Sequence, residues 1–274
     1  MTAAVVIPAR YHSTRFPGKP LATLHGIPLI QHVYQNAREA KLAQDVIIAT
    51  DSEKIRTAVL SFGGRAVMTS DKHVSGTDRI AEVARSLKYD IIVNVQGDEP
   101  LIKSAMIDDV ITLLEDGQAS ISTLAVTITD RNEIFNPNVV KVVCDQAGRA
   151  LYFSRAPIPY HRDLWNAQNM AVREPAPENA PDKDVPVGRT GSRQCESSGL
   201  HCFKHIGIYG YRKDILIRLS GLPQSRLEQC EKLEQLRALE NNIIIKVKKT
   251  CSDTIGVDTP EDLERVEKCL NISL

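Results

Sequence analysis

The stretch AAVVIPARYHSTRFPGKPL, residues 3–21, predicts a buried strand that runs directly into a cationic loop. Residues 3–9 are small or apolar, which is typical of a strand that is buried on both faces. The loop then places three cations and no acid within ten residues, at Arg10, Arg15 and Lys19. The sequence therefore concentrates positive charge at the carboxyl end of its first strand.

This concentration of charge predicts a phosphate-binding loop. Crowded like charges are costly unless an anion joins them, and a triphosphate supplies such an anion. Ser13 adds a hydroxyl, and Gly18 allows the backbone to approach a ligand closely. The loop is not a P-loop, because Pro20 follows Gly18-Lys19, and it lacks the G-x-G-x-x-G of dinucleotide-binding proteins. The alternative is a solvated basic loop with scattered counterions.

Short β-branched runs alternate with amphipathic stretches through the first half of the chain. This order favours an α/β fold with a mostly parallel sheet and helices on both faces. In such sheets the ligand crevice lies at the carboxyl ends of the strands. We expect strands at 3–9, 46–50, 66–68 and 91–95, and helices at 29–40, 53–62, 77–87 and, capped by Ser104, up to about 115.

The second half of the chain has a different character. A turn at 145–148 predicts a hairpin, and a polar, proline-rich stretch from about 165 to 200 predicts an excursion from the fold. Thr259 and Pro260 predict the start of a closing helix. We expect strands at 139–144, 151–154, 205–212, 243–247 and 254–257, and one helix at 226–240.

Two aspartates follow predicted strands and are candidate Mg²⁺ ligands. The run VNVQGDEP, residues 93–100, carries Asp98 past the end of its strand, and Asp258 follows the run TIGV in the same way. Mg²⁺ bridges phosphate oxygens and takes only one or two protein carboxylates, so this pair suits a bound triphosphate. The alternatives are that Asp98 caps a turn and that Asp258 belongs to a helix start.

Composition limits the classes of partner. Lys plus Arg and Asp plus Glu both number 34, so the positive excess typical of nucleic-acid-binding proteins is missing. No apolar run approaches the ~18 residues that a membrane span requires. The start of the chain has no basic leader, and its six cysteines contain no C-x-x-C pair. We therefore expect a cytoplasmic enzyme that acts on small-molecule substrates, binds no nucleic acid and does not insert into a membrane.

Taken in order, the motifs of this chain resemble those of the 3-deoxy-D-manno-octulosonate (Kdo) cytidylyltransferase family. The resemblance covers roughly residues 3–160 and 203–270. Its pieces are IPARYHSTRFPGKPL (7–21), SGTDR (75–79), VNVQGDEP (93–100), FNPNVVKVV (135–143), LYFSRA (151–156), HIGIYGYR (205–212), LEQLR (233–237) and GVDTPEDLER (256–265).

The resemblance implies the fold, the reaction and the roles of single residues. It implies a nucleotidyltransferase-type, Rossmann-like sheet, with CTP and Kdo as substrates, CMP-Kdo for lipopolysaccharide synthesis as product, Mg²⁺ as cofactor and a homodimer. It divides the chain into a nucleotide-binding core (1–134), a smaller sugar-binding and dimerisation region (135–250) and a return to the core (251–274). Arg10, Ser13, Arg15 and Lys19 would hold the triphosphate, Ser75, Gly76 and Arg79 would lie by the nucleotide, Asp98 and Asp258 would hold the metal, and Gln96, Arg155, His205, Tyr209, Glu231 and Gln235 would surround the sugar.

Side-chain chemistry fits this sugar set. Glu231 and Gln235 are spaced i, i+4 on the predicted helix, so both can reach one ligand. Arg155 can pair bidentately with a sugar carboxylate. His205 and Tyr209 share a face of their strand. The alternatives are a solvated helix face for the Glu–Gln pair and a structural role for His205.

Three departures from the family pattern and three rival functions complete the prediction. Asp78 stands where the family has Glu, RLEQCE (226–231) replaces PLEHIE, and the polar stretch is longer. The nearest rival is another nucleotidylyltransferase that uses a sialic acid or a sugar phosphate, and a sugar phosphate would call for more cations in the second half. A metal-dependent glycosyltransferase would need a D-x-D pair, which Gln96-Gly-Asp98 lacks, and a nucleotide-binding module without catalysis is the non-enzymatic rival.

Overall fold

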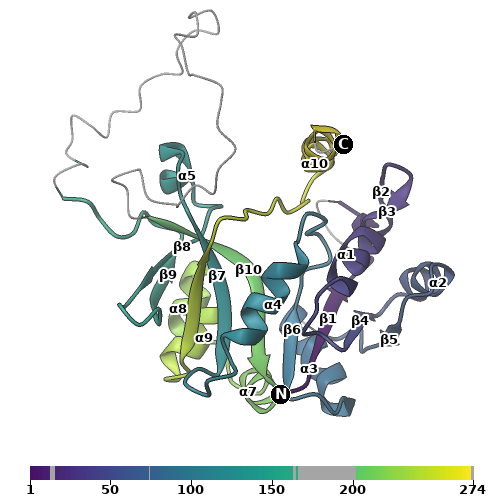
Figure 1. Ribbon diagram of the computed structural model, residues 1–274, viewed down its shortest axis with the longest axis horizontal. Helices are drawn as coiled ribbons and strands as arrows, with labels where there is room; N and C mark the ends of the chain where they lie inside the picture. The colour runs from purple at the N-terminus through teal and green to yellow at the C-terminus, as the bar shows by residue number, and fades with distance from the viewer. Residues whose placement is uncertain (13–15, 74, 163–164, 166–201, 273–274) are drawn as a thin grey trace, which may run out of the picture.

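The computed structural model describes residues 1–12, 16–73, 75–162, 165 and 202–272. One nine-stranded sheet forms the centre of the molecule, with helices on both faces (Figure 1). Its strand order is β11-β7-β10-β6-β1-β4-β5, and the hairpin β8–β9 joins at β10. None of the helices within these ranges is long and apolar enough to cross a membrane.

The first half of the chain builds the parallel part of the sheet. β1 (Ala3–Ala9) pairs in parallel with β4 (Asp45–Thr50) and with β6 (Ile91–Asn94), and β5 (Ala66–Met68) continues the sheet beyond β4. Because all four strands point the same way, the residues that follow them meet at one rim. The predicted strand at 3–9 is confirmed.

The two faces of this part are covered by different sets of helices. Val5 and Ile7 face one hydrophobic core, whereas Val6 faces the other, as the alternation of a strand requires. The first core is covered by α1 (Leu29–Arg38), α2 (Glu53–Ser61) and α4 (Ser104–Thr112), and the second by α3 (Gly76–Ser86), α7 (Lys213–Ser220) and α9 (Gln235–Glu240).

The second half adds a mixed part to the sheet. β10 (Phe203–Arg212) runs antiparallel between β6 and β7 (Ile121–Thr127), and β11 (Ile245–Thr250) runs parallel to β7. The predicted hairpin is confirmed as β8 (Lys141–Cys144) and β9 (Ala150–Ser154). The remaining elements are the 3₁₀ turn η1 (Lys19–Leu21), the ribbon β2 (Thr23–Leu24) and β3 (Ile27–Pro28), α5 (Arg131–Phe135), α8 (Arg226–Glu231) and α10 (Pro260–Ile272).

The predicted single helix at 226–240 is wrong, because the chain breaks after α8. Lys232 adopts a left-handed conformation (φ 55°, ψ 44°), and α9 starts at Gln235. In one continuous helix residues 228 and 237 would lie on opposite faces, about 13.5 Å apart along the axis. The break instead lets Arg237 form a buried ion pair with Glu228, with a nitrogen–oxygen distance of 2.5 Å.

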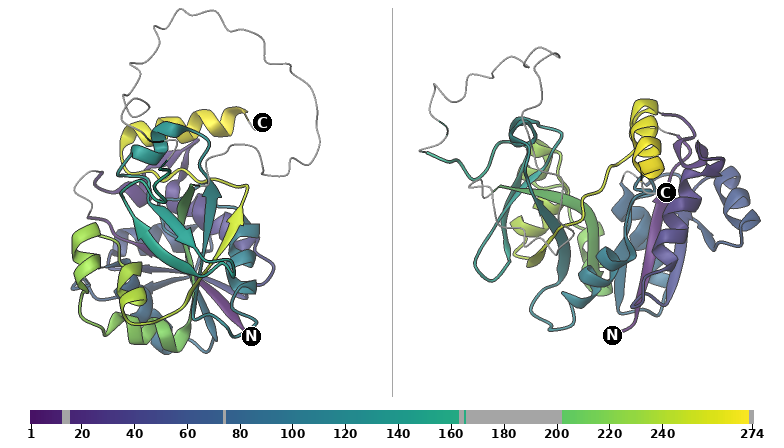
Figure 2. Two further views of the ribbon diagram at one scale, coloured as in Figure 1. Left: turned by 90° about the vertical axis from the view of Figure 1, so that its left-hand side faces the viewer. Right: turned by 45° about the horizontal axis from the view of Figure 1, so that its top comes forward.

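The predicted strand at 254–257 is also wrong. After β11 the chain crosses the rim in an extended form that pairs with no strand of the described sheet, and then enters α10 (Figures 1 and 2). Ile255 and Val257 pack into a small separate core with Leu24 and Leu29. The predicted cap at Ser104 is wrong as well, since Lys103 is the N-cap residue of α4 and its side chain forms no capping bond.

Candidate active site

Three predicted site residues meet at the rim, although they lie far apart in the sequence. The ammonium of Lys19 lies 2.5 Å from a carboxylate oxygen of Asp98 and 3.2 Å from one of Asp258. Lys19 is the least exposed of the three, with 14% of its side chain accessible, against 30% for Asp98 and 49% for Asp258. The prediction that Lys19 of the basic loop shares one rim with the two aspartates is confirmed.

Local backbone features bring these three side chains together. Gly18 has φ 72°, a conformation that favours glycine, and it leads into the 3₁₀ turn that carries Lys19. A Cβ on Gly97 would lie 2.9 Å from the carbonyl oxygen of Pro8, so glycine lets the chain pass close to β1 before Asp98. The backbone nitrogen of Val257 donates to the Asp98 carbonyl over 2.9 Å, which fixes the crossing segment beside it.

The chemistry of these donors fits a divalent cation carried in with a polyphosphate. Two carboxylates face one cationic group, and no third His, Cys, Asp or Glu joins them to form a metal-binding cluster in the described part of the chain. Mg²⁺ keeps several waters and is commonly bound by one or two carboxylates plus substrate phosphates. The set therefore suits Mg²⁺ better than it suits a metal that requires a complete protein cage.

A second group lies where β1 and β4 end. Arg79 is fully buried and pairs with Asp51 over 2.6 Å, so this ion pair fixes the position of Asp51 after β4. Arg10 lies beside this pair, and burial together with Arg79 lowers its pKa. Its Nη2 atom is buried without a hydrogen-bond partner among the described residues. Arg10 also lines a cavity of about 540 Å³. The cavity also has three carboxylates in its lining, so an anion would satisfy this nitrogen only if it were bound on the Arg10 side.

The predicted nucleotide segment 75–79 forms the N-terminus of α3. Ser75 and Asp78 make a capping box, with the Asp78 nitrogen donating to Ser75 Oγ over 3.1 Å and the Ser75 nitrogen donating to Asp78 over 3.2 Å. Asp78 thus serves as the third-position carboxylate of this capping box. Ser13 and Arg15 lie outside the described residues.

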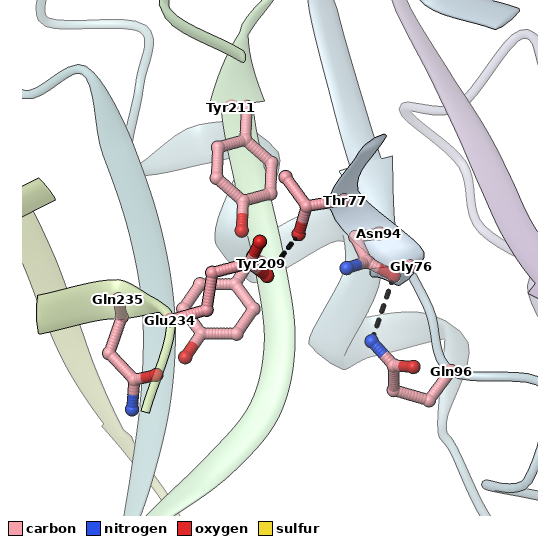
Figure 3. Close-up of a pocket in the computed structure, with 8 residues that line it drawn as sticks. All are labelled: Gly76, Thr77, Asn94, Gln96, Tyr209, Tyr211, Glu234 and Gln235. Atoms are coloured by element: carbon pink, nitrogen blue, oxygen red, sulfur yellow. Dashed lines mark hydrogen bonds between the residues drawn. The ribbon is translucent and has the colours of Figure 1, made fainter. Parts of the chain in front are cut away.

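A pocket of about 210 Å³ lies between α3 and α9, over the junction of β6 and β10 (Figure 3). It brings together three predicted residues, Gln96, Tyr209 and Gln235, with the predicted Gly76. Gln96 donates to the Asn94 side chain over 3.1 Å, which orients its amide. The pocket is lined by Gly76, Thr77, Asn94, Gln96, Tyr209, Tyr211, Glu234 and Gln235.

His205 lies behind this pocket as a neutral side chain. Burial lowers its pKa to about 3, and Nε2 lies 3.0 Å from the hydroxyl of Thr123. The ring packs edge-on against Phe153 and contacts Tyr209, whose pKa is raised by burial. His205 therefore supports the position of Tyr209, which itself faces the pocket.

Arg155 and Glu231 form a separate group. The backbone nitrogen of Arg155 donates to the Glu231 carboxylate over 3.0 Å, and the side-chain Nε of Arg155 donates to the Glu231 carbonyl over 2.8 Å. Lys141 is fully buried and donates to the Arg155 carbonyl over 2.5 Å. The predicted arrangement of Glu231 and Gln235 on one helix face is therefore wrong, because the break at Lys232 directs Glu231 toward Arg155 and leaves Gln235 at the pocket.

Four residues that line this pocket were missed by reasoning from the sequence, and Asn94, two positions before the predicted Gln96, is one of them. Thr77 follows the predicted Ser75-Gly76, Tyr211 shares a strand face with Tyr209, and Glu234 precedes Gln235, so each stands within two positions of a predicted residue. Glu99, whose pKa burial raises to about 7, was also missed, although it is not among the residues that line the pocket. Glu99 follows Asp98 directly, but nothing in the sequence indicates that its side chain turns inward.

Comparison with known proteins assigns the chain to a family. A family model described as cytidylyltransferase matches residues 4–250. The 3-deoxy-manno-octulosonate cytidylyltransferases of Thermodesulfovibrio yellowstonii and Geobacter sulfurreducens are 50% and 48% identical, over 99% and 97% of this chain and 99% and 98% of theirs.

Among solved structures, a CMP:2-keto-3-deoxy-manno-octonic acid synthetase complexed with CTP is similar over the whole of both chains. Its TM-score is 0.84 and its sequence identity is 39%. Since sequence and fold agree over the full length of these relatives, the chain belongs to the 3-deoxy-manno-octulosonate cytidylyltransferase family.

Proposed function

We propose that the chain transfers the cytidylyl group of CTP to Kdo, giving CMP-Kdo and pyrophosphate for lipopolysaccharide biosynthesis. The observation that carries this proposal is the meeting of Lys19, Asp98 and Asp258 at one rim. The two carboxylates supply ligands of the kind that Mg²⁺ takes, and the ammonium beside them can pair with a phosphate. The full-length relatives named above support CTP and Kdo as the substrates.

In this reaction the anomeric hydroxyl of the sugar attacks the α-phosphorus of CTP, and pyrophosphate leaves in line. Asp98 and Asp258 would hold Mg²⁺, which when bound neutralises charge on phosphate oxygens. Lys19 and Arg10 hold phosphate oxygens of the nucleotide, while Gln96, Tyr209 and Gln235 orient the sugar. Since little covalent chemistry is required of the protein, catalysis comes mainly from alignment and charge.

In this proposal the second half of the chain supplies most of the sugar-binding residues and the contact between the two subunits of the dimer. Support for the dimer contact comes from the edge of the sheet, because β9 pairs only with β8 among the described strands. Leu151 on β9 is 61% exposed, so this edge presents an apolar side chain to solvent. We place a cytoplasmic homodimer there, and size-exclusion chromatography with light scattering would report a monomer if the assignment were incorrect.

A pyrophosphate-release assay tests the proposed reaction. The four nucleoside triphosphates are each combined with Kdo, with a sialic acid and with a hexose 1-phosphate, with Mg²⁺ or with a chelator. We expect release only with CTP, Kdo and Mg²⁺. Release with a sugar phosphate in place of Kdo would assign the chain to another nucleotidylyl transfer, and CTP binding without turnover would favour a binding module.

A further inference from the structure

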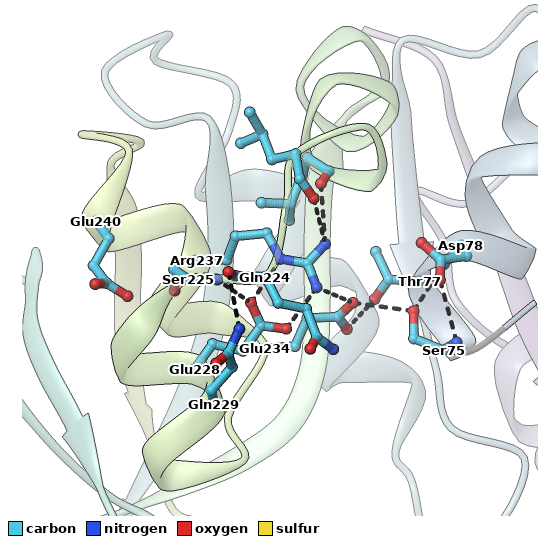
Figure 4. Close-up of polar contacts among 12 residues, drawn as sticks. Ser75, Thr77, Asp78, Gln224, Ser225, Glu228, Gln229, Glu234, Arg237 and Glu240 are labelled. Atoms are coloured by element: carbon cyan, nitrogen blue, oxygen red, sulfur yellow. Dashed lines mark hydrogen bonds and ion pairs between the residues drawn. The ribbon is translucent and has the colours of Figure 1, made fainter.

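One carboxylate of the pocket connects the two halves of the site. Glu234, just before α9, accepts hydrogen bonds from the hydroxyls of Ser75 over 3.0 Å and Thr77 over 2.6 Å (Figure 4). These hydroxyls lie at the N-terminus of α3, in the predicted nucleotide segment, and Glu234 lies beside Gln235 of the sugar set. The contact spans 159 positions of the sequence and lines the pocket between the two segments.

The position of Glu234 is fixed from its other side. The guanidinium of Arg237 lies 3.8 Å from the Glu234 carboxylate. Arg237 cannot easily move, because it is bound to Glu228 through two nitrogens, at 2.8 and 2.5 Å, and only 6% of its side chain is exposed. Glu234 is 31% exposed, and burial raises its pKa. A displacement of α9 would therefore be transmitted through Glu234 to the start of α3.

We propose that Glu234 is a positioning residue that couples the two substrate sites, so that occupancy of the sugar pocket strengthens the binding of the nucleotide. This inference rests on the proposed function. Its physical basis is that Ser75 Oγ caps α3 and also donates to Glu234, so the nucleotide segment and the sugar pocket share one hydrogen-bond network. Ordering one side of this network reduces the conformational cost of ordering the other.

Calorimetry with an unreactive nucleotide tests the coupling. The affinity for the α,β-methylene analogue of CTP is measured with Mg²⁺, without and with saturating Kdo. We expect Kdo to tighten analogue binding by about tenfold in the natural protein, within the usual range of coupling between sites. In Glu234→Ala this ratio should fall to about one. A ratio of one in the natural protein, or an unchanged ratio in Glu234→Ala, would overturn the proposal.

Three further variants separate coupling from general damage. Glu234→Gln should retain most of the ratio. Its amide oxygen can still accept from the Thr77 hydroxyl, and its amide nitrogen can donate to the Ser75 hydroxyl. Thr77→Val removes one donor without changing the shape of the side chain and should lower the ratio. Glu240→Ala, an exposed position at the end of α9, should keep the natural ratio. Glu234→Gln behaving like Glu234→Ala, or Glu240→Ala losing the ratio, would contradict a specific role of the hydrogen bonds.

Failure of this inference differs from failure of the proposed function. If the proposed reaction is incorrect, the natural protein releases no pyrophosphate from CTP and Kdo. If only the coupling is incorrect, the natural protein is active, and either its own ratio is about one or Glu234→Ala retains the natural ratio.

Discussion

The ammonium of Lys19 lies 2.5 Å from the carboxylate of Asp98, and the two residues are 79 positions apart in the chain. Lys19 therefore stands between the carboxylates that the proposed function assigns to the metal. A divalent cation that enters without nucleotide must compete with this ammonium for the two carboxylates. A metal–triphosphate complex instead brings phosphate oxygens with which the ammonium can pair. This relationship gives two of the following predictions.

Replacement of Asp98 by Asn should reduce turnover strongly without unfolding the protein. The amide keeps the shape of the side chain but removes the charge that would hold Mg²⁺. We expect kcat for pyrophosphate release to fall by about 100-fold or more, as when other charge-stabilising groups are lost. Asp116→Asn, at a surface pair with Lys246, is the matched control and should remain active. Near-natural turnover of Asp98→Asn at saturating Mg²⁺ would rule out the metal role.

Replacement of Lys19 by Met should affect nucleotide and metal in opposite directions. CTP binding should weaken by about tenfold, because a cation that pairs with phosphate is lost. Binding of Mn²⁺ alone should tighten by about three- to tenfold, since each partly exposed ion pair that the metal must break is worth up to about 1 kcal/mol. Titration calorimetry and Mn²⁺ electron paramagnetic resonance measure both, with Lys248→Met as control. Weaker Mn²⁺ binding in Lys19→Met would contradict the competition.

The buried pair of Arg237 and Glu228 should dominate the stability of the α8–α9 region. Arg237→Met leaves the Glu228 carboxylate buried without its partner, which costs about 3–5 kcal/mol in comparable cases. The double variant Arg237→Met, Glu228→Leu should recover much of this loss, because no charge is left unpaired. Urea unfolding measures both, and Lys246→Ala at the surface should cost only about 0–1 kcal/mol. Equal losses in the single and double variants would argue against the pair.

His205 should make stability depend on pH in the mildly acidic range. Its pKa of about 3 in the folded chain is below the ordinary value of 6.5. The unfolded state therefore binds a proton first as the pH falls below 6.5, and the free energy of unfolding decreases toward pH 3. Between pH 6.5 and 5 the slope should exceed that of His205→Gln by up to about 1.4 kcal/mol per pH unit. Parallel slopes in urea titrations of the two proteins would contradict the buried neutral state.

Much of the sheet and its rim could be predicted because local pattern and global fold agree there. The apolar run of β1 has no competing interpretation. The residues after parallel strands must share one edge, and this rule predicts that Lys19 and Asp98 lie close together. Arg10 shows the limit of this reasoning, since its charge was evident but its half-buried position beside Arg79 was not. Burial depends on packing between segments that the sequence does not relate to one another.

The errors lie where tertiary contacts override a continuous local pattern. Residues 226–240 have the periodicity of one helix, but the ion pair between Glu228 and Arg237 requires a break that periodicity does not reveal. Residues 254–257 have the composition of a strand, but Ile255 and Val257 bury their side chains against β2 and α1 instead of joining the sheet. Glu234 was missed because its role depends on hydroxyls 157 and 159 positions away.

The segment that crosses the rim after β11 has a consequence for how the enzyme is made. Asp258 reaches Lys19 only when this segment has been laid against Asp98, through the bond from the Val257 nitrogen. During synthesis every strand of the sheet leaves the ribosome before residue 258 does. A nascent or proteolytically shortened chain that stops before residue 258 can thus hold every described strand of the sheet and still lack one of the two carboxylates.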